Sequence, residues 1–205
     1  MHGLCLFVKP KMLIDMDYKS DVELLGQTFG AIVKNNSTMG MQWKNIYLSR
    51  VAAEILLNYL PESLPGEFDD MAGKVRLLEQ MLSYCPETDM PRAAIALREV
   101  IDNYAPNDDN TLALTKLREY IDPAVDASAW CEKWGRHLQF DPVERSERWE
   151  EVIYDVEKKV AQRLNYDEWH MGFCYRYWSV KEDVLADMGL EWHSPSVMNP
   201  DVMFD

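Results

Sequence analysis

The helical character of the chain is clearest in residues 142–164, PVERSERWEEVIYDVEKKVAQRL. Apolar side chains recur along this stretch every three or four positions, at Trp149, Val152, Ile153, Val156, Val160 and Leu164. Charged residues fill most of the other positions. Such a stripe covers one face of an α-helix and leaves the opposite face to water. We therefore expect an amphipathic surface helix over residues 142–164, with Asp141 as its cap and Pro142 at its first position.

The same helical spacing continues outward from this stretch, over most of the chain after residue 19. Ser20 and Glu23 have the spacing of a capping box, in which each side chain bonds to the backbone of the other, so we expect a helix to start there. Two more helices are predicted over residues 41–60 and over residues 68–85, because apolar positions repeat with helical period in both.

Caps and prolines predict the start of the next helices. Thr88 or Asp89 is expected to cap a helix that has proline in its first turn. Residues 106–110, PNDDN, are typical of a polar loop, and a short helix follows them. Another helix is predicted from Asp122-Pro123 to Gly135, since an acidic cap followed by proline favours a helix start and glycine a helix end.

These elements predict an all-α fold, namely a single-domain multi-helix bundle of about six to eight helices. A solenoid of stacked helical hairpins is the alternative. We expect residues 1–19 to form a loosely held N-terminal arm, residues 20–192 the helical domain, and residues 193–205 an extended C-terminal tail packed on that domain.

The C-terminal tail combines prolines with apolar side chains. Pro195 and Pro200 prevent one continuous helix. The tail also carries side chains too apolar for a freely solvated segment, at Val197, Met198, Val202, Met203 and Phe204. We expect these side chains to dock on helices of the same chain, with binding to another chain as the alternative.

Composition and charge exclude several classes of function. The 205 residues are 47% apolar and 27% charged, as in globular domains. The net charge is −14, from 35 acidic and 21 basic residues. We expect no nucleic acid to bind through a basic face and no adsorption to anionic membranes, because both depend on Lys and Arg. No apolar run reaches the ~20 residues that span a bilayer.

Cysteine usage indicates a reducing compartment. Cys5, Cys85, Cys131 and Cys174 lie far apart and form no C-x-x-C pair. Disulfide frameworks are typical of shorter secreted chains with denser cysteine. The N-terminal residues also lack the long apolar stretch of a secretory signal. We therefore expect reduced thiols and a cytoplasmic protein.

Residues 167–192, DEWHMGFCYRYWSVKEDVLADMGLEW, concentrate the aromatic side chains. Apolar residues follow two adjacent stripes, which predicts a centrally packed helix that ends at Gly189. A capping box at Ser179 and Glu182 offers an alternative in which the segment forms two helices.

His170 and Cys174 are candidates for metal ligands or a reactive pair, because residues four apart lie on one helix face and Zn²⁺ accepts both types. Two ligands do not complete a zinc site, however, and the sequence places no third. We therefore expect no metal, and favour a buried cysteine beside a hydrogen-bonded histidine in an aromatic core.

The same segment is a candidate surface for a ligand or a partner protein. Aromatic rings with an arginine among them can stack on planar groups. The candidate residues are Trp169, His170, Cys174, Tyr175, Arg176 and Trp178. Large core residues whose polar ends find hydrogen bonds are the favoured interpretation of this aromatic concentration.

Several catalytic motifs are missing from the sequence. It contains no glycine-rich phosphate loop, no H-E-x-x-H and no G-x-S-x-G. We expect no cofactor, and favour a non-catalytic module that binds another protein. A helical enzyme or metal-binding protein using His170 and Cys174 is the first alternative. An acidic decoy that occupies the basic groove of a DNA-binding protein is the second.

Overall fold

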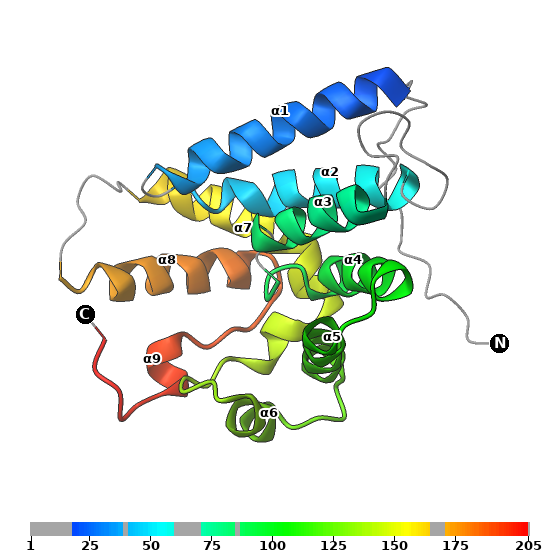
Figure 1. The fold of residues 1–205 in the computed structure, drawn as a ribbon. Coiled ribbons are helices and arrows are strands. Elements are labelled where there is room, and N and C mark those ends of the chain that lie inside the picture. Colours follow the sequence, from blue (N-terminus) through cyan, green and yellow to red (C-terminus); the bar gives the residue numbers. More distant parts are fainter. Residues whose placement is uncertain (1–17, 39–40, 60–70, 85–86, 165–170, 205) are drawn as a thin grey trace.

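The computed structural model describes residues 18–38, 41–59, 71–84, 87–164 and 171–204 (Figure 1). All regular secondary structure in these ranges is helical, and no strand occurs there. The all-α prediction is confirmed. The described ranges hold nine α-helices, of which the last has only four residues.

The helices follow one another with short connections. Their bounds are α1 Tyr18–Asn36, α2 Lys44–Tyr59, α3 Met71–Tyr84, α4 Pro91–Tyr104, α5 Asp108–Ile121, α6 Ala127–Trp134, α7 Glu147–Arg163, α8 Phe173–Asp187 and α9 Pro195–Met198. A single 3-10 turn, η1 Pro142–Arg145, precedes α7.

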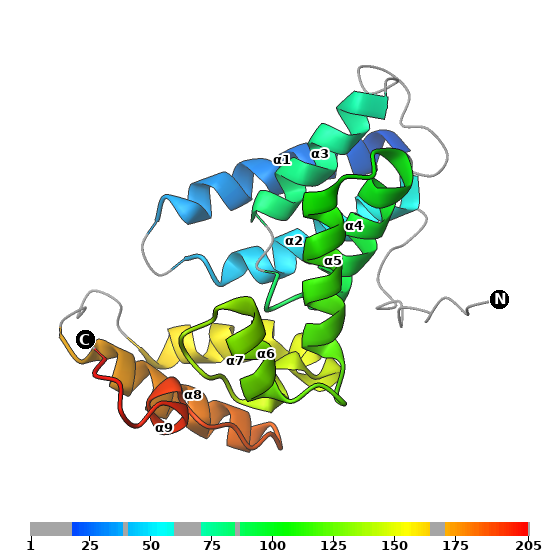
Figure 2. The same ribbon diagram turned by 60° about the horizontal axis from the view of Figure 1, so that its bottom comes forward.

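Consecutive helices pack as neighbours, and α2 also contacts helices from later in the chain. The pairs α1–α2, α3–α4, α4–α5 and α7–α8 are in contact, and α2 also lies against α3, α4 and α7 (Figures 1 and 2). In a solenoid each unit contacts only its neighbours along the chain. The contact between α2 and α7 therefore fits a multi-helix bundle.

The main hydrophobic core is shared by α1 to α4, α7 and α8. Leu56, Leu78, Leu97, Val156 and Val184 are fully buried in it. Full burial of such a side chain contributes about 1.5–3 kcal/mol. A second, smaller cluster lies at α5 and α6, and consists of Tyr120, Ala127, Trp130, Cys131 and Phe140.

The predicted stripe over residues 142–164 is buried, but the helix starts later than expected. All six stripe residues, Trp149, Val152, Ile153, Val156, Val160 and Leu164, belong to the main core. Asp141 caps η1, and the Ser146 hydroxyl accepts the Trp149 backbone N–H at 3.1 Å to start α7. A serine side chain that bonds the backbone in this way favours a new helix start over a continuous helix.

Three other predicted helix starts are wrong. Ser20 does not cap the first helix, because it lies within α1, which already includes Tyr18. Neither Thr88 nor Asp89 caps α4, because Met90 occupies the cap position without a side-chain hydrogen bond. The Met90 side chain is only 1% exposed, so apolar burial rather than capping sets this helix start. The helix expected from Asp122 begins at Ala127 instead, where Asp126 accepts the Ala129 backbone N–H at 2.9 Å.

The loop predicted over residues 106–110 is also shorter than expected. The helix α5 already begins at Asp108, because the Asn107 side chain accepts the Asn110 backbone N–H at 2.8 Å. The helix α8 is continuous through Ser179, so the predicted alternative of two helices is wrong. Gly189 follows α8 with a φ of 77°, a backbone conformation that glycine adopts without strain.

Candidate functional site

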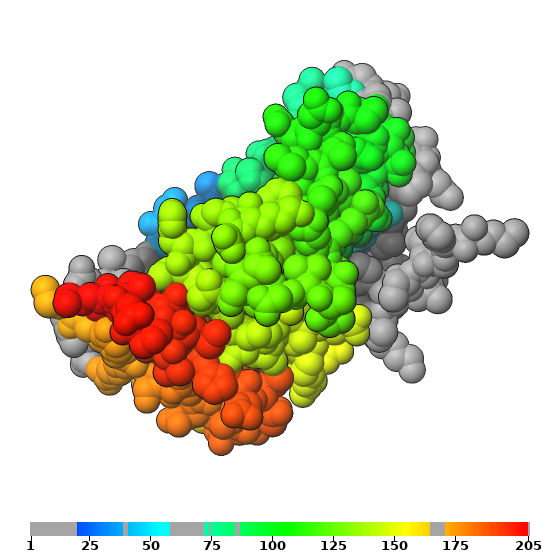
Figure 3. Space-filling model, turned by 90° about the horizontal axis from the view of Figure 1, so that it is seen from below, coloured from blue at the N-terminus to red at the C-terminus, as the bar shows by residue number. Residues whose placement is uncertain are grey.

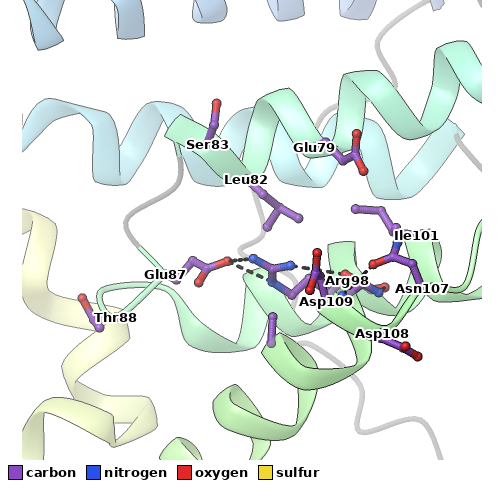
Figure 4. A pocket seen from close by; sticks show the side chains of 12 residues that line it. Glu79, Leu82, Ser83, Glu87, Thr88, Arg98, Ile101, Asn107, Asp108 and Asp109 are labelled. Atoms are coloured by element: carbon purple, nitrogen blue, oxygen red, sulfur yellow. Dashed lines mark hydrogen bonds and ion pairs between the residues drawn. The ribbon is translucent and has the colours of Figure 1, made fainter. Parts of the chain in front are cut away.

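The candidate site is an open cleft of about 1120 Å³ between α3, the turn at residues 87–89, α4 and α5 (Figure 4). Figure 4 shows Glu79 and Leu82 extending from α3 toward α4. The lining residues are Glu79, Leu82, Ser83, Glu87, Thr88, Arg98, Ile101, Asn107, Asp108, Asp109, Asn110 and Ala113. We call this feature the acidic cleft.

The lining carries four carboxylates and one cation. The cation is Arg98, whose Nε donates to Glu87 Oε1 at 2.9 Å and whose Nη1 donates to Asn110 Oδ1 at 3.3 Å. Glu79, Asp108 and Asp109 are exposed, and no described residue forms an ion pair with any of them. The cleft therefore has an excess of negative charge that the described residues do not neutralise.

The fold holds this lining in a fixed arrangement. Asn110 is buried, and its side-chain Nδ2 donates to the Arg98 carbonyl oxygen at 2.9 Å, which ties α5 to α4. Asp108 and Asp109 occupy the first turn of α5, where negative charge is favourable because the helix N-terminus is partly positive. These two carboxylates thus stabilise α5 as well as charging the cleft.

The cleft also offers apolar surface beside its carboxylates. Leu82 and Ile101 are core residues that reach the lining, and Ala113 completes it. Lys and Arg side chains place apolar stems on such a surface while their charged ends meet a carboxylate. The arrangement suits binding of basic side chains.

A second group of charges is buried between α7 and α8. Lys181 Nζ lies 2.7 Å from Glu157 Oε1, and the Tyr177 hydroxyl donates to the same carboxylate at 2.6 Å. The lysine and glutamate side chains are only 11% and 9% exposed. The Lys181 ammonium also lies 5.0 Å from the Trp149 ring centre and 5.3 Å from that of Trp192. We call these five residues the Lys181 site.

Further carboxylates surround the Lys181 site. Burial raises the pKa of Asp89 to about 6, against the opposing charge of Lys181. Burial also raises the pKa of Glu144, whose Oε1 accepts the Trp192 Nε1–H at 2.9 Å. In the described ranges, no group of three or more His, Cys, Asp or Glu is placed to hold a metal ion. Lys181 and Glu157 form the ion pair at the centre of this group, and Asp89 and Glu144 lie around it.

The residues predicted as a ligand surface are only partly described. Trp169 and His170 lie outside the described residues, so the pairing of His170 with Cys174 stays a prediction. Cys174 is a free thiol of intermediate exposure. Tyr175 and Trp178 are in edge contact, with ring centres 5.4 Å apart. Arg176 is exposed on the same helix.

Sequence reasoning missed both charged sites. Asp108, Asp109 and Glu87 have the pattern of ordinary turn residues, and nothing local shows that α3 faces them. For the Lys181 site a local signal existed, because Glu157 lies four residues after Ile153 on the buried face of α7. A charged residue at a buried position indicates a partner elsewhere in the fold.

Comparisons with known proteins add no family. No family model matches this sequence, and no curated protein or solved structure is significantly similar to it. Within the part of the chain that the structure describes, no helix combines the length and apolar character needed to cross a bilayer. The functional proposal therefore depends on the geometry and charge of the chain itself.

Proposed function

We propose that this protein is a non-catalytic interaction module of the cytoplasm, and that its acidic cleft binds a basic segment of another protein. The observation that supports the proposal is the lining of the cleft, in which four carboxylates accompany a single arginine that is already paired. Three of these carboxylates are free to meet Lys or Arg side chains of a partner.

The chain already contains one example of the proposed contact. The Arg98 guanidinium lies in the cleft and binds a carboxylate and an amide oxygen (Figure 4). Arginine favours such sites because its planar guanidinium presents several donors in a fixed geometry. A partner arginine or lysine beside Glu79 or Asp109 would repeat this chemistry with the carboxylates that Arg98 leaves available.

The charge of the whole protein supports the same type of partner. A net charge of −14 attracts a basic segment over several ångströms and raises the rate of encounter. Binding of this type weakens as salt rises, because ions screen charges on exposed surfaces. The free thiols of Cys131 and Cys174 are consistent with a reducing, cytoplasmic environment.

The first experiment identifies what lies in the cleft. A photo-crosslinking amino acid is placed at Ser83, which is exposed in the lining, and at the exposed Lys158 on α7 as a matched position outside it. We expect the Ser83 position to crosslink one partner segment that is rich in Lys and Arg, as sequenced by mass spectrometry. Crosslinks without an excess of basic residues, or equal crosslinking at Lys158, would contradict the proposal.

The second experiment tests the charge of the cleft. Glu79→Lys with Asp109→Lys reverses two exposed carboxylates, while Glu132→Lys with Asp183→Lys makes the same charge change on α6 and α8. Only the cleft variant should abolish the Ser83 crosslink and the partner affinity. Circular dichroism checks that both variants are folded. If the control pair weakens binding as much, net charge rather than the cleft recruits the partner.

A further inference from the structure

The C-terminal residues 189–204 cross from the end of α8 to the segment that precedes α7, and we call them the C-terminal strap. Figure 3 shows this strap in red, lying on the surface across α8 and beside the yellow-green segment before α7. It lies away from the acidic cleft (Figure 1).

The strap is attached by apolar contacts near both of its ends and by polar contacts between them. Trp192 is 7% exposed and packs on Trp149, with ring centres 6.1 Å apart. Farther along, Asn199 Oδ1 accepts the Gln139 backbone N–H at 2.7 Å, and Asn199 Nδ2 donates to the Gln139 carbonyl oxygen at 2.9 Å. Phe204 contacts Trp178 edge to face at 5.0 Å.

The first turn of the strap is held by a histidine and a carboxylate. The His193 backbone N–H donates to Asp141 Oδ2 at 2.8 Å, and the His193 ring Nδ1 lies 2.7 Å from the same oxygen. The next residue, Ser194, donates its backbone N–H to Glu182 of α8 at 3.2 Å. His193 thus links the strap to the segment before α7, and its neighbour links it to α8.

The charged groups of the described chain that act most strongly on His193 are acidic. Asp141 comes from the cap of η1, Glu182 from α8, and Glu191 from the strap itself. The hydrogen bond and charge of Asp141, followed by these other carboxylates, raise the pKa of His193 above its ordinary value. The protonated ring therefore binds these carboxylates more strongly than the neutral ring does.

Glu144 lies beneath the strap and responds to pH in a different way. Burial raises the pKa of Glu144, while the hydrogen bond that its Oε1 accepts from Trp192 lowers it. That hydrogen bond is stronger when the carboxyl is ionised, so loss of the Glu144 proton does not release Trp192. The pH dependence of the closed arrangement is therefore assigned to His193.

We propose that the C-terminal strap is a pH-responsive latch, held closed by protonated His193 and loosened when His193 loses its proton. Opening removes Trp192 from the Lys181 site and Phe204 from Trp178. It gives water access to the buried ion pair of Lys181 and Glu157. The strap is closed below about pH 6.5, which is the ordinary pKa of histidine. It loosens as the pH rises through the higher pKa that His193 has in the folded protein.

Hydrogen exchange of the full-length protein, followed by mass spectrometry, tests this latch. Exchange of peptides from residues 189–204 is measured between pH 6 and pH 8.5 and corrected for the intrinsic rate. Protection of these backbone amides should fall about two- to fivefold between pH 6 and pH 8.5, because this is the size of effect that one exposed ion pair produces. Peptides of α2 serve as the internal reference.

Two histidine variants make the test specific. His193→Gln cannot be protonated, so its strap should show the lower protection at every pH and lose most of the pH dependence. His137→Gln removes another exposed histidine of the described chain and should retain the wild-type pH dependence. Constant wild-type protection, or an unchanged pH dependence in His193→Gln, would overturn the proposal.

Discussion

The acidic cleft and the Lys181 site each hold a basic side chain among carboxylates, but the pair in the cleft is more exposed to water. Arg98 and Glu87 are 19% and 32% exposed in an open cleft, whereas Lys181 and Glu157 are 11% and 9% exposed beneath aromatic rings. Exposed ion pairs contribute about 0–1 kcal/mol, but loss of one partner from a buried pair costs about 3–5 kcal/mol. Similar charges therefore stabilise the fold at the Lys181 site, whereas in the acidic cleft they carry the recognition that we propose.

The largest expected effect comes from breaking the Lys181 pair. Lys181→Met leaves the Glu157 carboxylate buried without its cation, so the free energy of unfolding should fall by about 3–5 kcal/mol. Urea unfolding followed by circular dichroism measures the change. In the double variant Lys181→Met with Glu157→Gln, most of this stability should return. A single-variant loss below about 1 kcal/mol would mean that water already reaches the pair.

An intermediate effect is expected at Asp89, in the form of a pH dependence. Its raised pKa of about 6 means that the folded protein holds the Asp89 proton more tightly than the unfolded chain does. The resulting stability is present near pH 4 and is lost as pH rises through about 6. Asp89→Asn should therefore gain about 1–3 kcal/mol relative to wild type between pH 4 and pH 7.

The control for Asp89 is Asp183→Asn, which changes an exposed aspartate on α8. Unfolding curves at several pH values should show no comparable gain for this variant. The prediction would be wrong if the free energies of unfolding of Asp89→Asn and wild type differed by the same amount at every pH. Asp89 would then be solvated and would not belong to the charges around Lys181.

The smallest effect is expected in the acidic cleft. Arg98→Met removes the ion pair with Glu87 and the hydrogen bond to Asn110, and water can solvate the carboxylate that remains. The free energy of unfolding should therefore fall by only about 1 kcal/mol. Urea unfolding beside Lys181→Met gives the direct comparison. Equal losses for the two variants would show that the cleft is as closed to water as the Lys181 site.

Local patterns in the sequence predicted the helices better than their ends. The stripe from Trp149 to Leu164 was recognised because helical spacing is a local property, and all of it is buried. The start of α4 was mispredicted because burial of Met90 decides it, and this burial depends on distant helices. The same packing brings Asp89, which the sequence predicts as a possible cap, near the charges of Lys181 and Glu157.

The charged sites depend on contacts that no local pattern specifies. Glu157 and Lys181 are 24 positions apart and meet only because α7 packs on α8. The acidic cleft needs Glu79 from α3 to face Asp109 from α5, which the packing of α3 and α5 on α4 makes possible. Of the predicted ligand surface, Tyr175 and Trp178 are in contact, while Trp169 and His170 lie outside the described residues.

The contacts of α2 determine whether the chain can be cut into fragments that fold on their own. This helix contacts α1 and α3 on its own side, and α4 and α7 from the later part of the sequence. A fragment without α2 would expose the apolar faces of α4 and α7, and a fragment ending at α3 would leave α2 uncovered. We therefore expect residues 18–84 and 87–204 to unfold together, because loss of either part would uncover apolar surface of the other.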